Sequence, residues 1–270
     1  MNWVTGGLLS ALGSVPGEVI AFVGAGGKTT VAWRLLQELR GAGKPAVFTT
    51  TTQIFRPRSG WAELILDADP AAGDVSRALA GASSVVVAAR LGRRADRHRT
   101  DGDPSPAEGV KVTGLAPAVV DRLSRQLPAV TWLVEADGAR GRLLKAPAAH
   151  EPVIPSGTDR VVVVASLDAV GRALDEGTVH RPDIVARLLG VELGALITPE
   201  MIADTVSHPS GGMKGVPSGA QAVLLLTDWG EADRSTGAAV ADRVLRSGRI
   251  DRIVEADLRR AESVRAVWRS

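Results

Sequence analysis

Cysteine and tyrosine are absent from the 270 residues of this chain, and aromatic residues make up only 3% of it. Without cysteine there can be no disulfides and no thiolate metal ligands, and nothing indicates an oxidising compartment. With so few aromatic residues, a surface that stacks on nucleic-acid bases is not expected. The composition therefore argues against a disulfide-stabilised protein and against a nucleic-acid partner.

Long apolar runs and a strong net charge are missing as well. The net charge is +2, so the molecule as a whole is no obvious binder of polyanions. No apolar run is long enough to cross a bilayer. Residues 1–4 carry neither the basic region nor the apolar core of a signal peptide. We therefore expect a cytoplasmic protein without a membrane partner.

Lysine is scarce: only five of the 32 basic residues are lysines, and the others are arginines. In a chain that uses arginine by habit, each lysine has a raised chance of a chemical role. Two of the five, Lys28 and Lys145, fall in motifs selected below on other grounds. Hydrophobic residues make up 45% of the chain, and the length suits one large α/β domain over residues 1–270.

A glycine-rich segment follows the first predicted strand. The apolar run 19–23 indicates a buried strand, and residues 31–39 have the apolar spacing of a helix. Between them stands Gly24-Ala25-Gly26-Gly27-Lys28-Thr29-Thr30. In this context glycines let backbone N–H groups close around phosphate oxygens, and the helix start adds further N–H donors. We expect Lys28 to reach the outer phosphates and the Thr29 hydroxyl to ligate Mg²⁺.

This segment is shorter than the full phosphate-loop pattern. The pattern Gly-x4-Gly-Lys-Thr requires glycine at position 22, where this chain has Phe22. The alternative is an ordinary glycine-rich turn between a strand and a helix. Its place directly before a helix favours phosphate binding.

A second candidate region is the apolar strand 130–134, which leads into Glu135 and Asp137. A strand that ends in a carboxylate is typical of the acid that holds Mg²⁺ opposite a phosphate loop. The two acids are two residues apart, so they lie on the same side of the strand. Buried carboxylates are costly without a cation, and Mg²⁺ and Lys28 are suitable cations. We predict Asp137 as a metal ligand and Glu135 as the group that orients water or an acceptor.

The Glu-Ala-Asp pattern recurs at residues 255–257, directly after the predicted strand 250–254. There we expect an edge strand followed by an ordinary helix that Asp257 caps. The metal role is therefore assigned to the first copy.

Two further segments each allow two interpretations. Residues 49–52 are four threonines at the end of a predicted strand, the edge at which open parallel sheets bind ligands. A hydroxyl there, such as that of Thr51, could ligate Mg²⁺, although threonine also simply favours strands. Residues 90–99 are rich in arginine and could grip an anion, but aspartates nearby favour a solvated surface loop.

Residues 143–155 contain three prolines, which fix an extended loop. This loop places Lys145, His150 and Glu151 directly after the carboxylate strand. We expect it to bind substrate beside the terminal phosphate. The alternative is a rigid surface connection that carries ordinary polar residues.

Polar residues also flank two later elements. His180 and Arg181 precede a helix predicted from residue 182 to 189, where they would face an anion. Asp228 follows the predicted strand 222–226, and its carboxylate could bind the N–H groups of a guanine base. Trp229 could stack on a base or simply pack.

Taken together, these motifs resemble those of the YqeC family, whose members are described as accessory proteins of selenium-dependent molybdenum hydroxylases. The resemblance spans nearly the whole chain and rests on residues 23–30, 49–52, 135–141, 144–147, 150–155 and 179–182. It implies a P-loop nucleotide-binding protein that acts in maturation of a molybdenum enzyme, with the hydroxylase or a cofactor-delivery protein as partner. Relatives tend to carry an Asn-Lys/Gln-x-Asp type of sequence after the strand 222–226. This chain has Thr227-Asp228-Trp229 there, so both ATP and GTP remain open.

The predicted fold is a three-layer, P-loop NTPase-like α/β fold with a largely parallel sheet and its site at the carboxyl ends of the strands. Residues 1–17 would form a short amphipathic N-terminal helix that ends at Gly13 and Pro16 and covers the sheet. Residues 90–110 and 138–158 would be functional or surface loops, and a strand at 250–254 would close the sheet.

The sequence leaves three functions open: a Mg²⁺-dependent NTPase or phosphoryl transferase, a nucleotide-gated partner-binding protein with slow hydrolysis, or a P-loop fold that has lost catalysis. In the second, NTP binding would order residues 49–58 and 138–155 for docking. The candidate residues are, for catalysis, Lys28, Glu135, Asp137 and Lys145; for the nucleotide, Gly24, Ala25, Gly26, Gly27, Lys28, Thr29, Thr30 and Asp228; for the metal, Thr29, Thr51 and Asp137; and for a substrate, Arg140, Lys145, His150, Glu151, His180 and Arg181.

Overall fold

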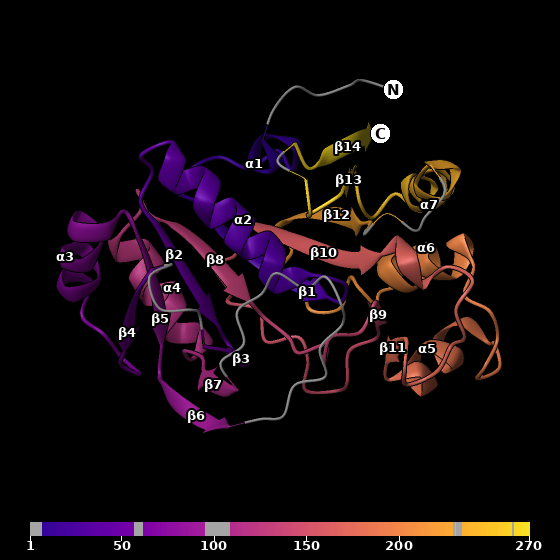
Figure 1. The fold of residues 1–270 in the computed structure, drawn as a ribbon, viewed down its shortest axis with the longest axis horizontal. Coiled ribbons are helices and arrows are strands. Elements are labelled where there is room, and N and C mark those ends of the chain that lie inside the picture. Colours follow the sequence, from indigo (N-terminus) through magenta and orange to yellow (C-terminus); the bar gives the residue numbers. More distant parts are fainter. Residues whose placement is uncertain (1–6, 57–61, 95–108, 229, 231–233, 261) are drawn as a thin grey trace.

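The central feature of the fold is a nine-stranded sheet (Figure 1). A computed structural model describes residues 7–56, 62–94, 109–228, 230, 234–260 and 262–270. The strands of the sheet are β1 (Val19–Gly24), β2 (Ala46–Thr50), β4 (Glu63–Leu66), β5 (Ser84–Ala88), β8 (Thr131–Glu135), β10 (Arg160–Ser166), β12 (Gln221–Thr227), β13 (Arg252–Ala256) and β14 (Val264–Arg269). Their order is β14-β13-β12-β10-β1-β8-β2-β5-β4. Every neighbouring pair is parallel except β13 and β14.

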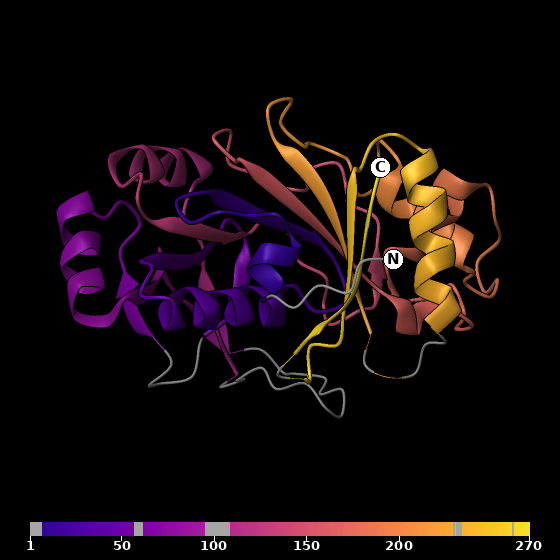
Figure 2. The same cartoon turned by 90° about the horizontal axis from the view of Figure 1, so that it is seen from above.

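Helices cover both faces of this sheet and complete a three-layer α/β fold (Figure 2). The helices are α1 (Leu8–Ala11), α2 (Lys28–Gly41), α3 (Ala72–Ala82), α4 (Pro117–Gln126), α5 (Pro182–Leu189), α6 (Pro199–Ser207) and α7 (Arg234–Arg246). Helices α1 and α2 pack on one face, where Ile20 and Phe22 point from β1. Ala21 and Val23 of the same strand point to the other face, which α5, α6 and α7 cover on the β10 side and α3 and α4 on the β2 side. The alternation of side chains along a strand explains why β1 is apolar throughout.

Two small sheets flank the main one. Strands β3 (Gln53–Phe55), β7 (Val110–Thr113) and β6 (Arg90–Arg94) form an antiparallel sheet, and β9 (Leu144–Lys145) pairs in parallel with β11 (Val179–His180). The predicted loop 90–110 is thus wrong at its start, because β6 pairs with β7. The aspartates at 96, 101 and 103 lie outside the described residues.

The N-terminal helix is short and ends before Gly13, as predicted; the φ of Gly13 is 71°. Within the predicted segment 1–17 it covers Leu8 to Ala11. Its first amides, those of Leu8 and Leu9, donate to the two carboxylate oxygens of Glu38 at 2.9 Å each. The segment therefore packs on α2, as its buried Leu8 and Leu12 also show, and residues 1–6 are outside the described part.

The C-terminal end differs from the prediction in two respects. β13 is an interior strand, and β14 forms the edge of the sheet. No helix begins after Asp257 in the described residues 258–260 and 262–270, which form a turn and then β14. The reason is that Asp257, with no exposed surface, binds Arg259, Arg260 and Arg265 instead of capping a helix.

Because the strands are parallel, the carboxyl ends of β1, β8, β10 and β12 meet at one edge, where a ligand site of an open α/β sheet is expected. Among the residues that the structure describes, no helix has both the length and the apolar character needed to cross a membrane.

Candidate functional site

The glycine-rich loop connects the end of β1 to the start of α2, as predicted from the sequence. Gly24 and Gly26 have φ values of 94° and 88°, which side-chain-bearing residues rarely adopt. A Cβ at Gly24 would lie 2.3 Å from the carbonyl oxygen of Val164, and one at Gly26 would lie 2.7 Å from the amide nitrogen of Ser166. Both glycines are therefore required by the close approach of β10.

Part of this loop is already hydrogen-bonded to the protein. The amides of Ala25 and Gly26 donate to the carbonyls of Val164 and Arg142, both at 2.9 Å. The first N–H groups of α2, beginning at Lys28, have no acceptor within the helix, because a helix leaves its first four donors unpaired. These donors and the positive end of the helix dipole make the start of α2 the part of the loop that is best suited to an anion.

The two carboxylates after β8 lie directly beside this loop. Lys28 Nζ is 3.1 Å from Asp137 Oδ1 and 4.0 Å from Glu135 Oε1, and it donates to the carbonyl of Gly24 at 2.6 Å. The Thr29 hydroxyl donates to Glu135 Oε2 at 2.7 Å. Lys28 and Thr29 of the loop thus meet both acids at one point, although more than 100 positions separate the loop from the acids along the chain.

Burial raises the pKa of Glu135, because the low-dielectric surroundings disfavour its charged form, and Asp137 adds repulsion. Lys28 and the Thr29 hydroxyl offset only part of this effect. Glu135 therefore holds a proton more tightly than an ordinary glutamate, a property that suits a group that exchanges protons with water.

Lys145 extends the ion pairs away from the loop. Its Nζ is 2.8 Å from Asp137 Oδ2 and 2.8 Å from Glu151 Oε2, and it donates to the carbonyl of Gly138 at 2.6 Å. Arg181 Nη1 donates to the same Glu151 oxygen at 2.6 Å. We call this alternating series of charges the ion-pair chain; it runs Glu135, Lys28, Asp137, Lys145, Glu151, Arg181.

The ion-pair chain shifts the pKa values of groups at its far end. Burial disfavours the charge of Glu151, but hydrogen bonds from Arg181 and Lys145 outweigh burial and lower its pKa to about 2. Burial, followed by the charges of Arg181 and Lys145, lowers the pKa of His180 to about 4. At neutral pH Glu151 is ionised and His180 is neutral.

Comparison with known proteins places these residues in one family. The family model described as "YqeC protein" matches residues 20–183, a span that includes every member of the ion-pair chain. The chain belongs to the YqeC family. The Escherichia coli (strain K12) protein described as "Uncharacterized protein YqeC" is 30% identical over 217 residues, which cover 80% of this chain and 78% of that relative.

In this YqeC-family chain, two hydroxyls of the threonine run hydrogen-bond to backbone carbonyls of neighbouring segments. The Thr50 hydroxyl donates to the carbonyl of Glu135 at 2.7 Å, and the Thr51 hydroxyl donates to the carbonyl of Val153 at 2.6 Å. The amide of Thr51 also donates to the Glu135 carbonyl at 3.1 Å. The run therefore ties the end of β2 to the carboxylate strand and to the proline-rich loop, and a metal at Thr51 would have to displace its present acceptor.

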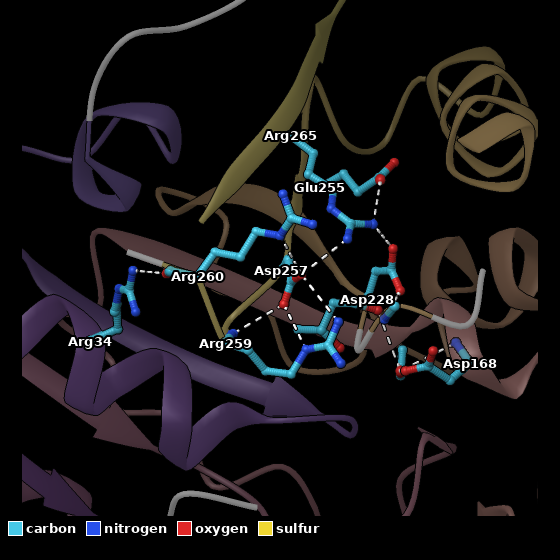
Figure 3. A network of polar contacts seen from close by, with 11 residues as sticks. Arg34, Asp168, Asp228, Glu255, Asp257, Arg259, Arg260 and Arg265 are labelled. Atoms are coloured by element: carbon cyan, nitrogen blue, oxygen red, sulfur yellow. Dashed lines mark hydrogen bonds and ion pairs between the residues drawn. The ribbon is translucent and has the colours of Figure 1, made fainter. Parts of the chain in front are cut away.

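Asp228 lies in a separate polar network at the end of β12 (Figure 3). It is 1% exposed and pairs with Arg265 of β14, and its Oδ1 accepts the amide of Gly230 at 2.5 Å. Arg265 also lies 3.0 Å from Asp257 Oδ2 and 3.9 Å from Glu255 Oε1. The predicted contact of Asp228 with a guanine base would require this pair to open, and Trp229 lies outside the described residues.

The remaining predicted substrate residues differ in their surroundings. Arg140 and His150 are exposed, and Arg140 has a φ of 51°. Lys145 and Glu151 are buried and face each other, and Arg181, with a φ of 65°, precedes α5. The structure thus brings Lys145, Glu151 and Arg181 into the ion-pair chain and leaves Arg140 and His150 at the surface.

The sequence reasoning missed one contact with the loop. The Thr227 hydroxyl, at the end of β12, donates to the carbonyl of Gly26 at 2.6 Å. A threonine at the carboxyl end of a central parallel strand was the available signal, because such ends meet at the ligand edge.

The oxygen donors beside the loop suit Mg²⁺. Within the described part of the chain, no group of three or more histidine, cysteine, aspartate or glutamate side chains could hold a metal ion. Two carboxylates and the Thr29 hydroxyl are present instead, and Mg²⁺ in phosphate sites is held by one or two carboxylates together with the phosphates. The donor set therefore fits a magnesium ion that completes its coordination with phosphate oxygens.

Proposed function

We propose that this YqeC-family protein binds a Mg²⁺–nucleoside triphosphate at the start of α2 and hydrolyses it or transfers its terminal phosphoryl group. The observation that carries the proposal is the meeting of Lys28 and Thr29 with Glu135 and Asp137 at one sheet edge. In keeping with the family resemblance, we propose that this activity serves maturation of a selenium-dependent molybdenum hydroxylase.

The roles of the residues follow from their positions. The first N–H groups of α2 and the Lys28 ammonium would bind phosphate oxygens. Thr29 and Asp137 would hold Mg²⁺, which supplies charge stabilisation for the phosphoryl group. Glu135, with its raised pKa, would orient and accept a proton from water or an acceptor. Catalysis would rest on positioning and electrostatics.

A second candidate is a nucleotide-gated partner-binding protein with slow hydrolysis. One observation favours it: Thr51 hydrogen-bonds both to Glu135 and to Val153, so two segments expected to dock a partner are tied to the site itself. A change at Glu135 on nucleotide binding would reach both segments. Stimulation of hydrolysis by a small molecule would favour the enzyme, and stimulation only by a protein partner would favour the gate.

The decisive experiment is calorimetric titration of ATP and of GTP, with and without Mg²⁺, into the wild type, Lys28→Ala and Lys44→Ala. Lys44 is exposed, so its variant is the matched control. We expect micromolar, Mg²⁺-dependent binding of at least one nucleotide to the wild type and to Lys44→Ala. Lys28→Ala should bind at least tenfold more weakly, because it loses the cation at the phosphates.

Absence of binding to the wild type would contradict both candidate functions. Equal loss in Lys28→Ala and Lys44→Ala would place the nucleotide elsewhere. Thermal unfolding of the three proteins without nucleotide shows whether Lys28→Ala is folded.

A further inference from the structure

Lys145 has no open side toward a substrate. Its side chain is 1% exposed, and three oxygens surround Nζ at 2.6–2.8 Å. An ammonium group has three protons, so these partners use its whole donor capacity. This arrangement is that of a structural cation within the site, not of a lysine directed at an acceptor.

The partners of Lys145 fix the orientation of Asp137. Asp137 Oδ2 receives Lys145 Nζ at 2.8 Å and the amide of Gly24 at 3.1 Å. Its other oxygen, Oδ1, lies 3.1 Å from Lys28 Nζ on the loop side. One carboxylate oxygen is thus held by the protein, and the other is presented to the phosphate loop.

Glu151 holds Lys145 in turn. Its Oε2 is 2.8 Å from Lys145 Nζ and 2.6 Å from Arg181 Nη1. Without Glu151 the Lys145 ammonium would lose one of its three acceptors, and Asp137 would be its one remaining carboxylate partner among these three.

We propose that Lys145 and Glu151 are positioning residues, which orient Asp137 so that its Oδ1 receives the divalent cation of the nucleotide complex. This inference rests on the proposed function, and it replaces the predicted contact of both residues with a substrate. Partners of this kind typically change metal affinity 10- to 100-fold when they are removed.

Simple electrostatics and positioning predict opposite changes in cation affinity when Lys145 is replaced. Removal of a positive charge next to Asp137 would tighten the binding of any cation there. Loss of orientation would weaken it. The sign of the effect in Lys145→Met therefore separates positioning from simple electrostatics.

The experiment measures Mn²⁺ affinity by calorimetry and by electron paramagnetic resonance. The proteins are saturated with a non-hydrolysable analogue of the nucleotide that the wild type binds. They are the wild type, Lys145→Met, Glu151→Gln, the double variant and Glu176→Gln, an exposed matched control. Affinity for the analogue in EDTA is measured in parallel, because a general loss of structure would lower it too.

We expect Mn²⁺ to bind about tenfold more weakly to Lys145→Met and to Glu151→Gln, with little change for Glu176→Gln or for the analogue in EDTA. The double variant should be no weaker than Lys145→Met, because Glu151 acts through Lys145. Tighter or unchanged Mn²⁺ binding in Lys145→Met, or fully additive losses, would overturn the proposal.

Two further outcomes have a defined meaning. If Lys145→Met does not fold, Lys145→Arg decides, because it keeps the positive charge and changes only the donor geometry: selective loss of Mn²⁺ affinity supports positioning, and wild-type affinity overturns it. If the wild type binds no nucleotide, the proposed function itself fails, a result distinct from normal binding with unaltered variants.

Discussion

At the scale of single residues, the site consists of charges that compensate one another. The ion-pair chain places three acids and three bases in alternation, mostly away from water. Removing one partner of a buried pair costs about 3–5 kcal/mol, because the other charge stays buried and unpaired. The residues are therefore coupled, and single substitutions will be felt by their neighbours.

His180 reports on this coupling. Nuclear magnetic resonance titration of its ring should give a pKa of about 4 in the wild type, since burial and then Arg181 and Lys145 disfavour the charged imidazole. Arg181→Met should raise this pKa, because it removes a nearby cation and leaves Glu151 to attract a proton.

The same shift gives a pH dependence of folding. The unfolded chain protonates His180 near pH 6.5, and the folded protein does so only near pH 4. The unfolded state therefore binds more protons in this window, and the contribution of His180 to stability is lost as the pH falls through it. A wild-type pKa near 6.5 would contradict this description.

At the scale of elements, the loop between β1 and α2 is set by the approach of β10. Gly24 and Gly26 lie against backbone atoms of Val164 and Ser166, which cannot rotate away as a side chain could. The shortened loop, with Phe22 buried in β1, thus depends on two positions where no side chain fits.

Gly24→Ala should destabilise the protein by about 1–3 kcal/mol from backbone strain alone, with more from the clash, and should abolish nucleotide binding. Gly41→Ala is the matched control, because nothing lies within 4 Å of its added Cβ and it is the last residue of α2. That control should be neutral or stabilising by up to about 1 kcal/mol. Urea denaturation measures both, and equal stability of the two variants would show that the loop can move.

At the scale of the whole molecule, one sheet joins strands from residue 19 to residue 269. Buried apolar clusters on both faces share its strands, and β1 contributes to each. The single domain expected over residues 1–270 stays a prediction, which unfolding can test.

Unfolding should accordingly be one cooperative transition. Trp33 in α2, Trp132 in β8 and Trp268 in β14 place fluorescent probes across the sheet. We expect tryptophan fluorescence and circular dichroism to give coincident urea curves. Saturating Mg²⁺–nucleotide at 100 times its dissociation constant should shift both by about 2.7 kcal/mol. Two separate transitions would instead indicate two units.

The sequence by itself determined the elements whose signals are local. The strand–glycine loop–helix unit and the acids after β8 could be predicted, because periodicity and turn chemistry act within a few residues. The α/β class followed from the alternation of such units.

Only the tertiary structure decided which distant groups became partners. In the fold β3, β7 and β6 pair with one another, and β14 forms an edge of the main sheet. Asp228 pairs with Arg265, and Lys145 pairs with Asp137 and Glu151. The physical reason is that a buried charge must find a counter-charge in the folded chain, and spacing along the sequence does not specify which one. From the sequence the same lysine could have faced a substrate or a carboxylate, and in the fold its ammonium lies beside Asp137 and Glu151.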